Sequence, residues 1–193
     1  MRLERAEIIP PKQILFSAGG FFLSKRILLN KKTIMDRVSI TRSITRLSHE
    51  IIESIDSGHE RVLIGIHNRG VPLAKRIQSE ILNINGLKIK LGFLDITFHR
   101  DDYRERLVMP EVRGTDIQFR IDDKVVILID DVLFTGRTVR ASLDELNSFG
   151  RASKVQLAVL VDRGHRELPI KADFIGKNIP THEGEHVEVN LSL

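Results

Sequence analysis

Two adjacent carboxylates followed by a small polar turn are the residues of this chain best suited to chemistry. Asp130 and Asp131 directly follow the apolar run 125–129. Three residues separate Asp131 from the turn 135–138, Thr-Gly-Arg-Thr. Adjacent ionised carboxylates repel each other, so they require cations, hydrogen-bond donors or water. A ribose supplies two neighbouring hydroxyl donors, and Mg²⁺ supplies charge. The turn offers backbone N–H groups, hydroxyls and a helix N-terminus, which suit a phosphate monoester.

The same residues also have a simpler interpretation, as a solvated strand end followed by an ordinary helix cap. The whole run favours a site, because four apolar residues, Asp-Asp, three residues and Thr-Gly-x-Thr match the signature of type I phosphoribosyltransferases. No Gly-Lys-Ser/Thr follows the glycine, so the run does not match a Walker P-loop. We therefore expect a site for phosphoribosyl diphosphate (PRPP).

The element that carries the carboxylates is predicted to be a buried parallel strand. Residues 125–129 are all Val, Ile or Leu without polar alternation, which is typical of a strand covered on both faces. We expect this strand to end where the charges begin. A second apolar strand, 61–66, precedes Arg69-Gly70, which is either a diphosphate-binding turn or only a turn. Ligands of open α/β sheets bind beyond the carboxyl ends of the strands, so these segments are expected to share one pocket.

The remaining pattern predicts one α/β domain. The apolar spacing predicts a helix with Ile40, Ile44, Leu47, Ile51 and Ile55 on its buried face, after a cap at Asp36 or Ser39. Further helices are predicted over 71–83 and 138–149, the latter with Val139, Leu143 and Leu146 inward. Further strands are predicted over 87–96, 154–161, 172–177 and 186–191.

Length and composition restrict the class of protein. The 193 residues suffice for one domain, and the absence of cysteine excludes disulfides and thiolate metal sites. No apolar run approaches membrane-spanning length, so a cytoplasmic protein without a membrane partner is expected. The net charge of +4 is concentrated in residues 1–33, which carry 7 basic and 2 acidic side chains. Any RNA contact in the rest of the chain must therefore come from a local patch.

Residues 1–32 are predicted to be a poorly ordered N-terminal extension of the domain 33–193. They contain Pro10-Pro11, Gly19-Gly20 and a short apolar cluster without a sustained period. One hypothesis is an extension from an upstream start, with Met35 near the natural beginning. The alternative is a basic arm that helps to hold RNA.

Two exposed segments carry basic groups. Arg42, Thr45, Arg46 and His49 recur three or four residues apart, so they form one strip of the first helix, which is either an RNA contact or a solvated face. The polar connection 97–115 contains Arg100 and is either a lid or merely a mobile loop. A lid would keep water from the C1 carbon as it develops positive charge. His165, His182 and His186 lack metal-ligand spacing, so no metal held by histidine or cysteine is expected.

The C-terminal third carries a specific family resemblance. The runs 161–170 (VDRGHRELPI) and 176–181 (GKNIPT) resemble the bacterial pyrimidine-operon attenuation regulators that double as uracil phosphoribosyltransferases. Thr-Arg at 45–46, His-Glu at 49–50, Asp-Ile-Thr at 95–97, Arg-Asp-Asp at 100–102 and the run 125–140 fit the same pattern. The resemblance covers about residues 33–191, and general phosphoribosyltransferases lack the C-terminal motif.

The resemblance implies a type I phosphoribosyltransferase fold, with a mostly parallel sheet flanked by helices, a small hood and a flexible lid loop. It implies a regulator that senses uridine nucleotides and promotes transcription termination, or attenuation, of pyrimidine biosynthetic genes. It also implies transfer from PRPP to uracil, giving UMP and diphosphate, with Mg²⁺ bound together with PRPP. The implied partners are a pyrimidine-operon leader mRNA, UMP or UTP, and further copies of the chain in a homodimer or homotetramer.

The resemblance also assigns residues. Asp130 and Asp131 would hold the ribose hydroxyls, with Arg100 closing over the leaving diphosphate. The PRPP and nucleotide contacts would be Arg69, Gly70, Thr135, Gly136, Arg137, Thr138, Val161, Asp162 and Arg163. The RNA-binding face would comprise Thr45, Arg46, His49, His165, Arg166, Lys171 and Lys177, which mix cations with neutral donors, as binding to looped RNA requires. On this assignment Arg166→Ala would weaken RNA binding and spare transfer.

Three departures leave alternatives open. His99 stands where the family usually has tyrosine, His67-Asn68 replaces a lysine-containing pair, and the sequence stops at Leu193, short of the family's last strand or hairpin. The alternatives are an RNA-binding regulator with weak or lost transferase activity, and a salvage phosphoribosyltransferase for another base.

Overall fold

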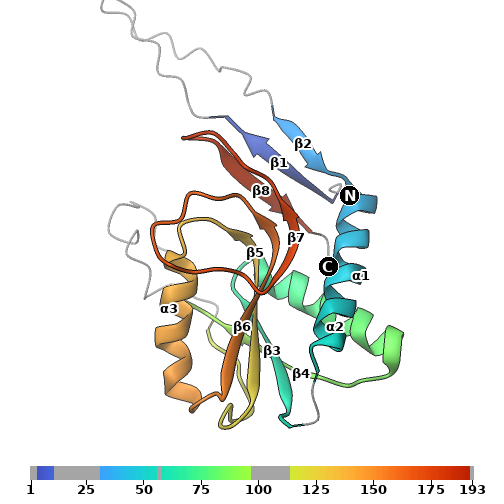
Figure 1. Ribbon diagram of the computed structural model, residues 1–193, viewed down its shortest axis with the longest axis vertical. Helices are drawn as coiled ribbons and strands as arrows, with labels where there is room; N and C mark the ends of the chain where they lie inside the picture. The colour runs from blue at the N-terminus through green and yellow to red at the C-terminus, as the bar shows by residue number, and fades with distance from the viewer. Residues whose placement is uncertain (1–3, 11–30, 56–57, 97–113, 192–193) are drawn as a thin grey trace, which may run out of the picture.

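The computed structural model describes residues 4–10, 31–55, 58–96 and 114–191. They are organised around a parallel sheet in the order β4-β3-β5-β6-β7 (Figure 1). Its strands are β3 (Arg61–Ile66), β4 (Lys90–Leu94), β5 (Val125–Leu133), β6 (Lys154–Asp162) and β7 (Phe174–Asn178). Every neighbouring pair in this sheet is parallel, which confirms the expected α/β class.

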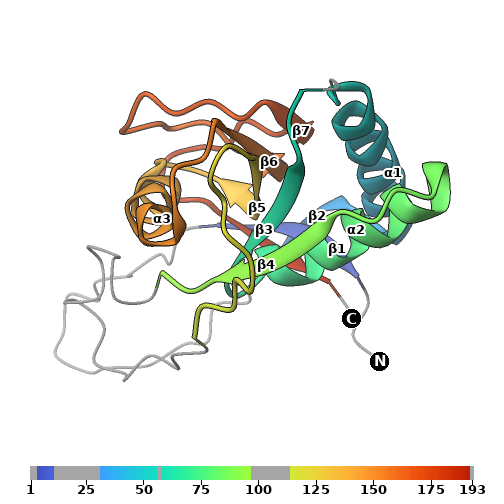
Figure 2. The same ribbon diagram turned by 90° about the horizontal axis from the view of Figure 1, so that it is seen from below.

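Helices cover both faces of the parallel sheet. Helices α1 (Arg37–Glu53) and α2 (Gly70–Asn85) lie on one face, and α3 (Arg137–Leu146), continued by the 3-10 turn Asn147–Phe149, lies on the other (Figure 2). Leu63 packs in the core beneath α1 and α2, whereas Val62 and Ile64 pack in the core beneath α3. The strands are therefore apolar on both faces, as their continuous apolar runs predicted.

The start of α1 follows the expected local signal, whereas one residue of α3 that was predicted to be buried is exposed. The carboxylate of Asp36 accepts a hydrogen bond from the backbone N–H of Ser39 at 2.8 Å, which confirms Asp36 as the cap of α1. The prediction that Leu143 points inward is wrong, because its side chain is 37% exposed. The small residues Ala141 and Ser142 are buried in its place, so α3 packs closely through a small-residue face.

Strand β5 extends beyond the two aspartates, which corrects the expectation that it ends where the charges begin. Its pairing with β3 stops at Ile129, opposite Gly65. Its pairing with β6 continues to Leu133, opposite Asp162. Asp130 and Asp131 thus remain in regular strand geometry although the pairing with β3 on one side has already ended.

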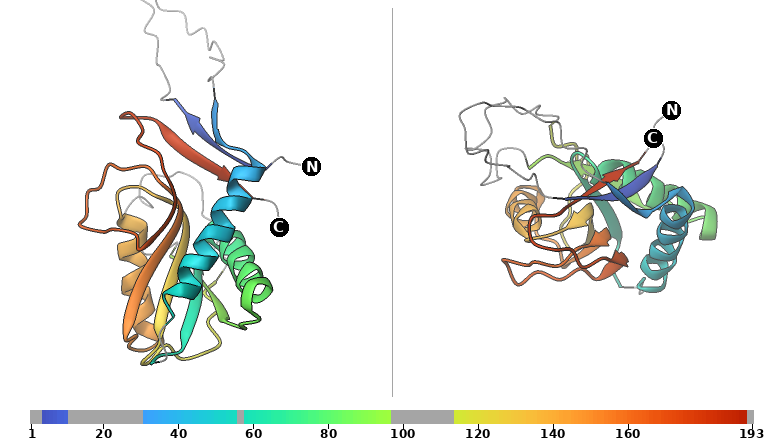
Figure 3. Two further views of the ribbon diagram at one scale, coloured as in Figure 1. Left: turned by 45° about the vertical axis from the view of Figure 1, so that its right-hand side comes forward. Right: turned by 90° about the horizontal axis from the view of Figure 1, so that it is seen from above.

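A smaller antiparallel sheet lies beyond the carboxyl ends of the parallel strands (Figures 1 and 3). Its order is β2-β1-β8, with β1 (Arg5–Ile9), β2 (Lys32–Met35) and β8 (His186–Asn190). It corresponds to the expected hood. The expectation that residues 1–32 are a disordered extension is wrong for β1, because Ala6 is completely buried and the strand pairs on both edges. None of the described helices is long and apolar enough to cross a membrane.

Candidate functional site

The ends of β3 and β5 meet around the two aspartates. Asp130 is 8% exposed, and its carboxylate accepts a hydrogen bond from the backbone N–H of Asp131 at 2.9 Å. The carboxylate of Asp131 lies 3.9 Å from the guanidinium of Arg69, in the loop after β3. The peptide bond between His67 and Asn68 in that loop is cis. A Cβ atom at Gly70 would clash with the carbonyl oxygen of Ile129, so only glycine lets this loop approach β5 so closely.

The electrostatics of the pair favour a ligand that supplies donors or positive charge. Burial raises the pKa of Asp131, and the positive charge of Arg69 opposes that rise. The described residues contain no group of three or more His, Cys, Asp or Glu side chains that could hold a metal ion by itself. This donor set fits Mg²⁺ that is bound mainly by substrate phosphates, because such Mg²⁺ needs only one or two protein carboxylates.

The turn between β5 and α3 is built to present backbone N–H groups. Gly136 adopts a φ of 94°, a left-handed conformation that favours glycine, and α3 begins directly after it. The first turn of a helix leaves backbone N–H groups without acceptors in the helix. The carbonyl of Thr135 accepts hydrogen bonds from the backbone N–H groups of Glu167 and Leu168 at 3.0 and 3.1 Å. The side chain of Arg137 pairs with Glu167 at 2.7 Å, and the backbone N–H of Arg137 donates to the hydroxyl of Thr135 at 3.3 Å.

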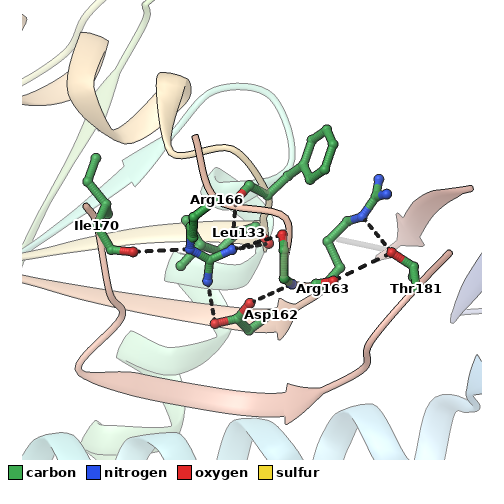
Figure 4. A network of polar contacts seen from close by, with 8 residues as sticks. Leu133, Asp162, Arg163, Arg166, Ile170 and Thr181 are labelled. Atoms are coloured by element: carbon green, nitrogen blue, oxygen red, sulfur yellow. Dashed lines mark hydrogen bonds and ion pairs between the residues drawn. The ribbon is translucent and has the colours of Figure 1, made fainter. Parts of the chain in front are cut away.

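Arg166 connects this turn to the end of β6 (Figure 4). Its guanidinium donates to Asp162 at 2.5 Å and to the carbonyls of Phe134, Ile170, Gly164 and Leu133 at 2.6, 3.0, 3.1 and 3.4 Å. The guanidinium thus bonds to two strand ends and to its own loop. The side chain of Arg166 is 23% exposed and its guanidinium is bound within the protein, whereas the sequence pattern favoured a direct RNA contact.

The third strand end, at β6, borders the same turn. Val161 is completely buried, and the backbone N–H of Arg163 donates to the carbonyl of Leu133 at 3.1 Å. The guanidinium of Arg163 stacks 3.9 Å from the ring centre of Phe134 and donates to Thr181 at 3.1 Å. Burial lowers the pKa of Arg163, opposed by Glu185. The structure therefore places the predicted base-side residues next to the predicted phosphate turn.

The predicted RNA-binding residues form a looser group around the edge strand β7. Arg46 on α1 donates to the carbonyls of Ile175 and Gly176 at 3.0 and 2.5 Å. Lys177, on β7 itself, donates to the carbonyl of Ile34 at 3.0 Å. The ring of His165 lies 2.7 Å from the carbonyl of Thr181, three residues beyond β7. These side chains sit beside one sheet edge but already bind backbone carbonyls.

Three other predicted RNA contacts lie differently. His49 and Lys171 are exposed. Thr45 faces α2, where its hydroxyl donates to Glu80 at 2.6 Å along a groove of about 370 Å³ between α1 and α2. Thr45 and Arg46 therefore contact different neighbours, α2 and β7, and do not form one exposed strip.

The lid residue Arg100 lies outside the described residues. The structure adds Glu188, which sequence reasoning missed. Its carboxylate lies 3.0 Å from the guanidinium of Arg69 and 3.3 Å from the ammonium of Lys31. No local signal identifies this glutamate, because its partners lie far away along the chain.

Comparisons with known proteins agree with this geometry. The model of the phosphoribosyl transferase domain family matches residues 31–192. The "Bifunctional protein PyrR" of Clostridioides difficile is 53% identical over 164 residues, covering 85% of this chain and 93% of the relative. The "Bifunctional protein PyrR" of Oceanobacillus iheyensis is 56% identical over 167 residues, with the same coverage. The family resemblance expected from the sequence is confirmed.

Solved structures share the fold at much lower identity. A hypoxanthine phosphoribosyltransferase from Staphylococcus aureus has a TM-score of 0.59 and 20% identity, covering 75% of this chain and 76% of that chain. The enzyme of Trypanosoma cruzi in complex with the product IMP has a TM-score of 0.55 and 17% identity, covering 74% and 73%. At this identity the likeness concerns the fold alone, and it agrees with the expected type I architecture.

Proposed function

The chain belongs to the PyrR family of phosphoribosyltransferases, and from this premise we propose that it transfers ribose 5-phosphate from PRPP to uracil and regulates pyrimidine genes through RNA. The names of the relatives and the matched domain support both parts. The observation that carries the proposal is the meeting of three strand ends, at Arg69, Asp131 and Arg163, around one phosphate-type turn.

Each part of PRPP has a matching element in this arrangement. Asp130 and Asp131 accept hydrogen bonds from the ribose hydroxyls, and the turn 135–138 binds the 5′-phosphate through its N–H groups. Arg69 and the amides near Gly70 bind the diphosphate. Uracil lies against Val161, Asp162 and Arg163. The guanidinium of Arg163 stacks on Phe134 beside the proposed base site. These four contacts hold C1 of the ribose in line with the base, which lowers the entropic part of the barrier.

The leaving group determines what else the site must provide. Negative charge grows on the diphosphate while positive charge grows on the ribose ring, so Arg69 stabilises the former and the buried carboxylates the latter. Mg²⁺ bound to PRPP would neutralise further charge on the diphosphate, and Asp130 and Asp131 are the carboxylates that would help to hold it. Arg100, in the segment outside the described residues, is proposed to close over the diphosphate.

The regulatory part of the proposal rests on the loop 163–170, which connects the predicted nucleotide site to the predicted RNA-binding face. Arg166 binds the carbonyls of Leu133 and Phe134 beside the phosphate turn, while its neighbour His165 contacts Thr181 beyond β7. The loop 163–170 therefore belongs to the nucleotide site and to the proposed RNA face at once. Thr45, Arg46, His49, Lys171 and Lys177 complete that face, and a homodimer or homotetramer belongs to the same proposal.

Formation of UMP tests the enzymatic part directly. The purified chain is incubated with PRPP, Mg²⁺ and either uracil or hypoxanthine, and the nucleotide products are separated by chromatography. UMP from uracil, with no IMP from hypoxanthine, supports the assignment. IMP without UMP would favour a salvage enzyme for another base.

A further inference from the structure

A row of alternating charges connects the small sheet to the proposed diphosphate site. Its four links beyond Arg5 are Glu7–Lys31 at 3.7 Å, Lys31–Glu188 at 3.3 Å, Glu188–Arg69 at 3.0 Å and Arg69–Asp131 at 3.9 Å. Arg5 begins the row with an ion pair to Glu7 at 3.1 Å. Only the two residues at its inner end, Arg69 and Asp131, belong to the predicted PRPP site. The row therefore attaches an additional carboxylate, Glu188, to a PRPP-binding arginine.

The pairing of the small sheet determines where Glu188 lies. Glu188 on β8 is directly opposite Glu7 on β1 in an antiparallel register. Like charges in opposite positions destabilise a sheet, and Lys31 offsets this by lying between the two carboxylates. Strand β1 lies outside the matched family region 31–192 and is the strand that joins β2 to β8. A segment outside the family domain thus holds Glu188 over the diphosphate loop.

The environment of Glu188 keeps it charged. Partial burial raises the pKa of Glu188, but Lys31 and Arg69 together outweigh burial and hold the pKa below its ordinary value. Its side chain is 29% exposed and that of Arg69 is 45% exposed, so both side chains have room to change partners. A charged carboxylate therefore lies where a diphosphate oxygen would approach the same guanidinium.

We propose that Glu188 is a positioning residue that binds Arg69 when diphosphate is absent, so that PRPP binding and diphosphate release exchange one anion for the other. This inference rests on the proposed transferase function. When the diphosphate group binds Arg69, Lys31 remains beside Glu188 and keeps its carboxylate paired. When the reaction ends, Glu188 returns to Arg69 and promotes departure of the product. The exchange weakens PRPP binding and speeds diphosphate release.

The opposite role predicts the opposite result. If Glu188 only braced Arg69 in the correct orientation, removing its charge would weaken diphosphate binding. If the two anions compete, the neutral but equally long side chain in Glu188→Gln must tighten binding. A single partly exposed charge at this distance is worth about a three- to tenfold change in affinity.

The experiment compares the wild-type chain with three variants by calorimetric titration with magnesium diphosphate and with PRPP. Glu183→Gln is the matched control, since Glu183 is exposed in the segment before β8 and its loss changes the net charge equally. Glu188→Gln is expected to bind both ligands about three- to tenfold more tightly and to lower the KM for PRPP in parallel. Glu183→Gln is expected to match the wild type. Glu188→Asp, which retracts the carboxylate without removing it, is expected to lie between.

Equal affinity in Glu188→Gln and Glu183→Gln, or weaker binding in Glu188→Gln than in the wild type, would overturn the exchange. Thermal melting of all variants identifies any that fails to fold, and Glu188→Asp then provides the comparison. A wild-type chain that binds neither diphosphate nor PRPP would overturn the proposed function, and this inference with it. Binding by the wild type without a difference among the variants would overturn the role of Glu188 alone.

Discussion

Arg69 and Arg166 follow two strands of the same parallel sheet, but their surroundings differ in kind. Arg69 is half exposed and faces two carboxylates, Asp131 and Glu188. Arg166 is less exposed and binds four backbone carbonyls as well as Asp162. A half-exposed arginine paired with carboxylates can exchange them for an incoming anion, whereas an arginine bound to backbone carbonyls fixes the backbone around it. Residue type alone suggested an anion contact for both.

The largest effect is expected from a substitution at Asp131, among the proposed ligand-binding residues. Asp131→Asn keeps the shape of the side chain but removes the charge that the sugar ring requires as it becomes positive. UMP formation should fall by about 100-fold or more, as for other losses of transition-state charge. RNA affinity, measured by filter binding, should remain within about twofold, because Asp131 lies in the pocket away from β7. Lost RNA binding with unchanged catalysis would reverse the assignment of the two sites.

The second largest effect is expected at Arg166, which holds the backbone of its loop in place. Arg166→Ala removes the guanidinium that binds Asp162 and the carbonyls at 133 and 134, so it should lower both UMP formation and RNA affinity. Loss of a partner by a partly buried carboxylate should also cost about 1–3 kcal/mol of unfolding free energy. Arg166→Lys should not restore these properties, because an ammonium group cannot reproduce the fork of donors.

Urea unfolding, turnover and RNA titration are measured on the same Arg166 preparations. Arg120→Ala is the matched control, since Arg120 is exposed and pairs only locally with Asp122, at 2.6 Å. Normal turnover and stability in Arg166→Ala, combined with lost RNA binding, would restore the direct RNA contact that the sequence pattern favoured.

The smallest effect is expected at the exposed histidine of α1. His49→Ala should weaken RNA binding about five- to tenfold and reduce its salt dependence slightly, because one donor on the proposed face is lost. Stability and UMP formation should not change, since His49 is exposed. His59→Ala is the control, because His59 is also exposed but lies in the segment before β3 and not on α1. Equal RNA affinity in the two variants would remove α1 from the RNA face.

The sequence predicted the parts of the molecule that depend on local patterns. The buried strand 125–129, the close turn at Gly70 and the cap at Asp36 each follow from neighbouring residues, and the structure contains all three. The order of charged loops after apolar strands also indicated that Arg69, Asp131 and Arg163 lie at the same edge of the sheet. These features are predictable because a strand end and its loop are determined within a few residues.

Features that depend on distant partners were not predictable. Strand β1 was missed because its pairing partner β8 lies at the other end of the chain. The hydrogen bonds of Arg166 were not predicted, because backbone carbonyls accept them and carbonyls leave no signature in residue types. Glu188 was missed for the first of these reasons, since its position depends on the register between β1 and β8. Long-range register and backbone acceptors are therefore the information that only the structure supplies.

The central claim is that the loop held by Arg166 belongs to the nucleotide site and to the RNA face together. A titration of the wild-type chain with a pyrimidine-operon leader RNA, with and without UMP and against an unrelated RNA, tests it most directly. We predict that UMP changes the affinity for the leader RNA at least about fivefold, within the usual range of coupling between sites, and leaves the unrelated RNA weakly bound. The same leader affinity with and without UMP, or equal binding of both RNAs, would contradict the account.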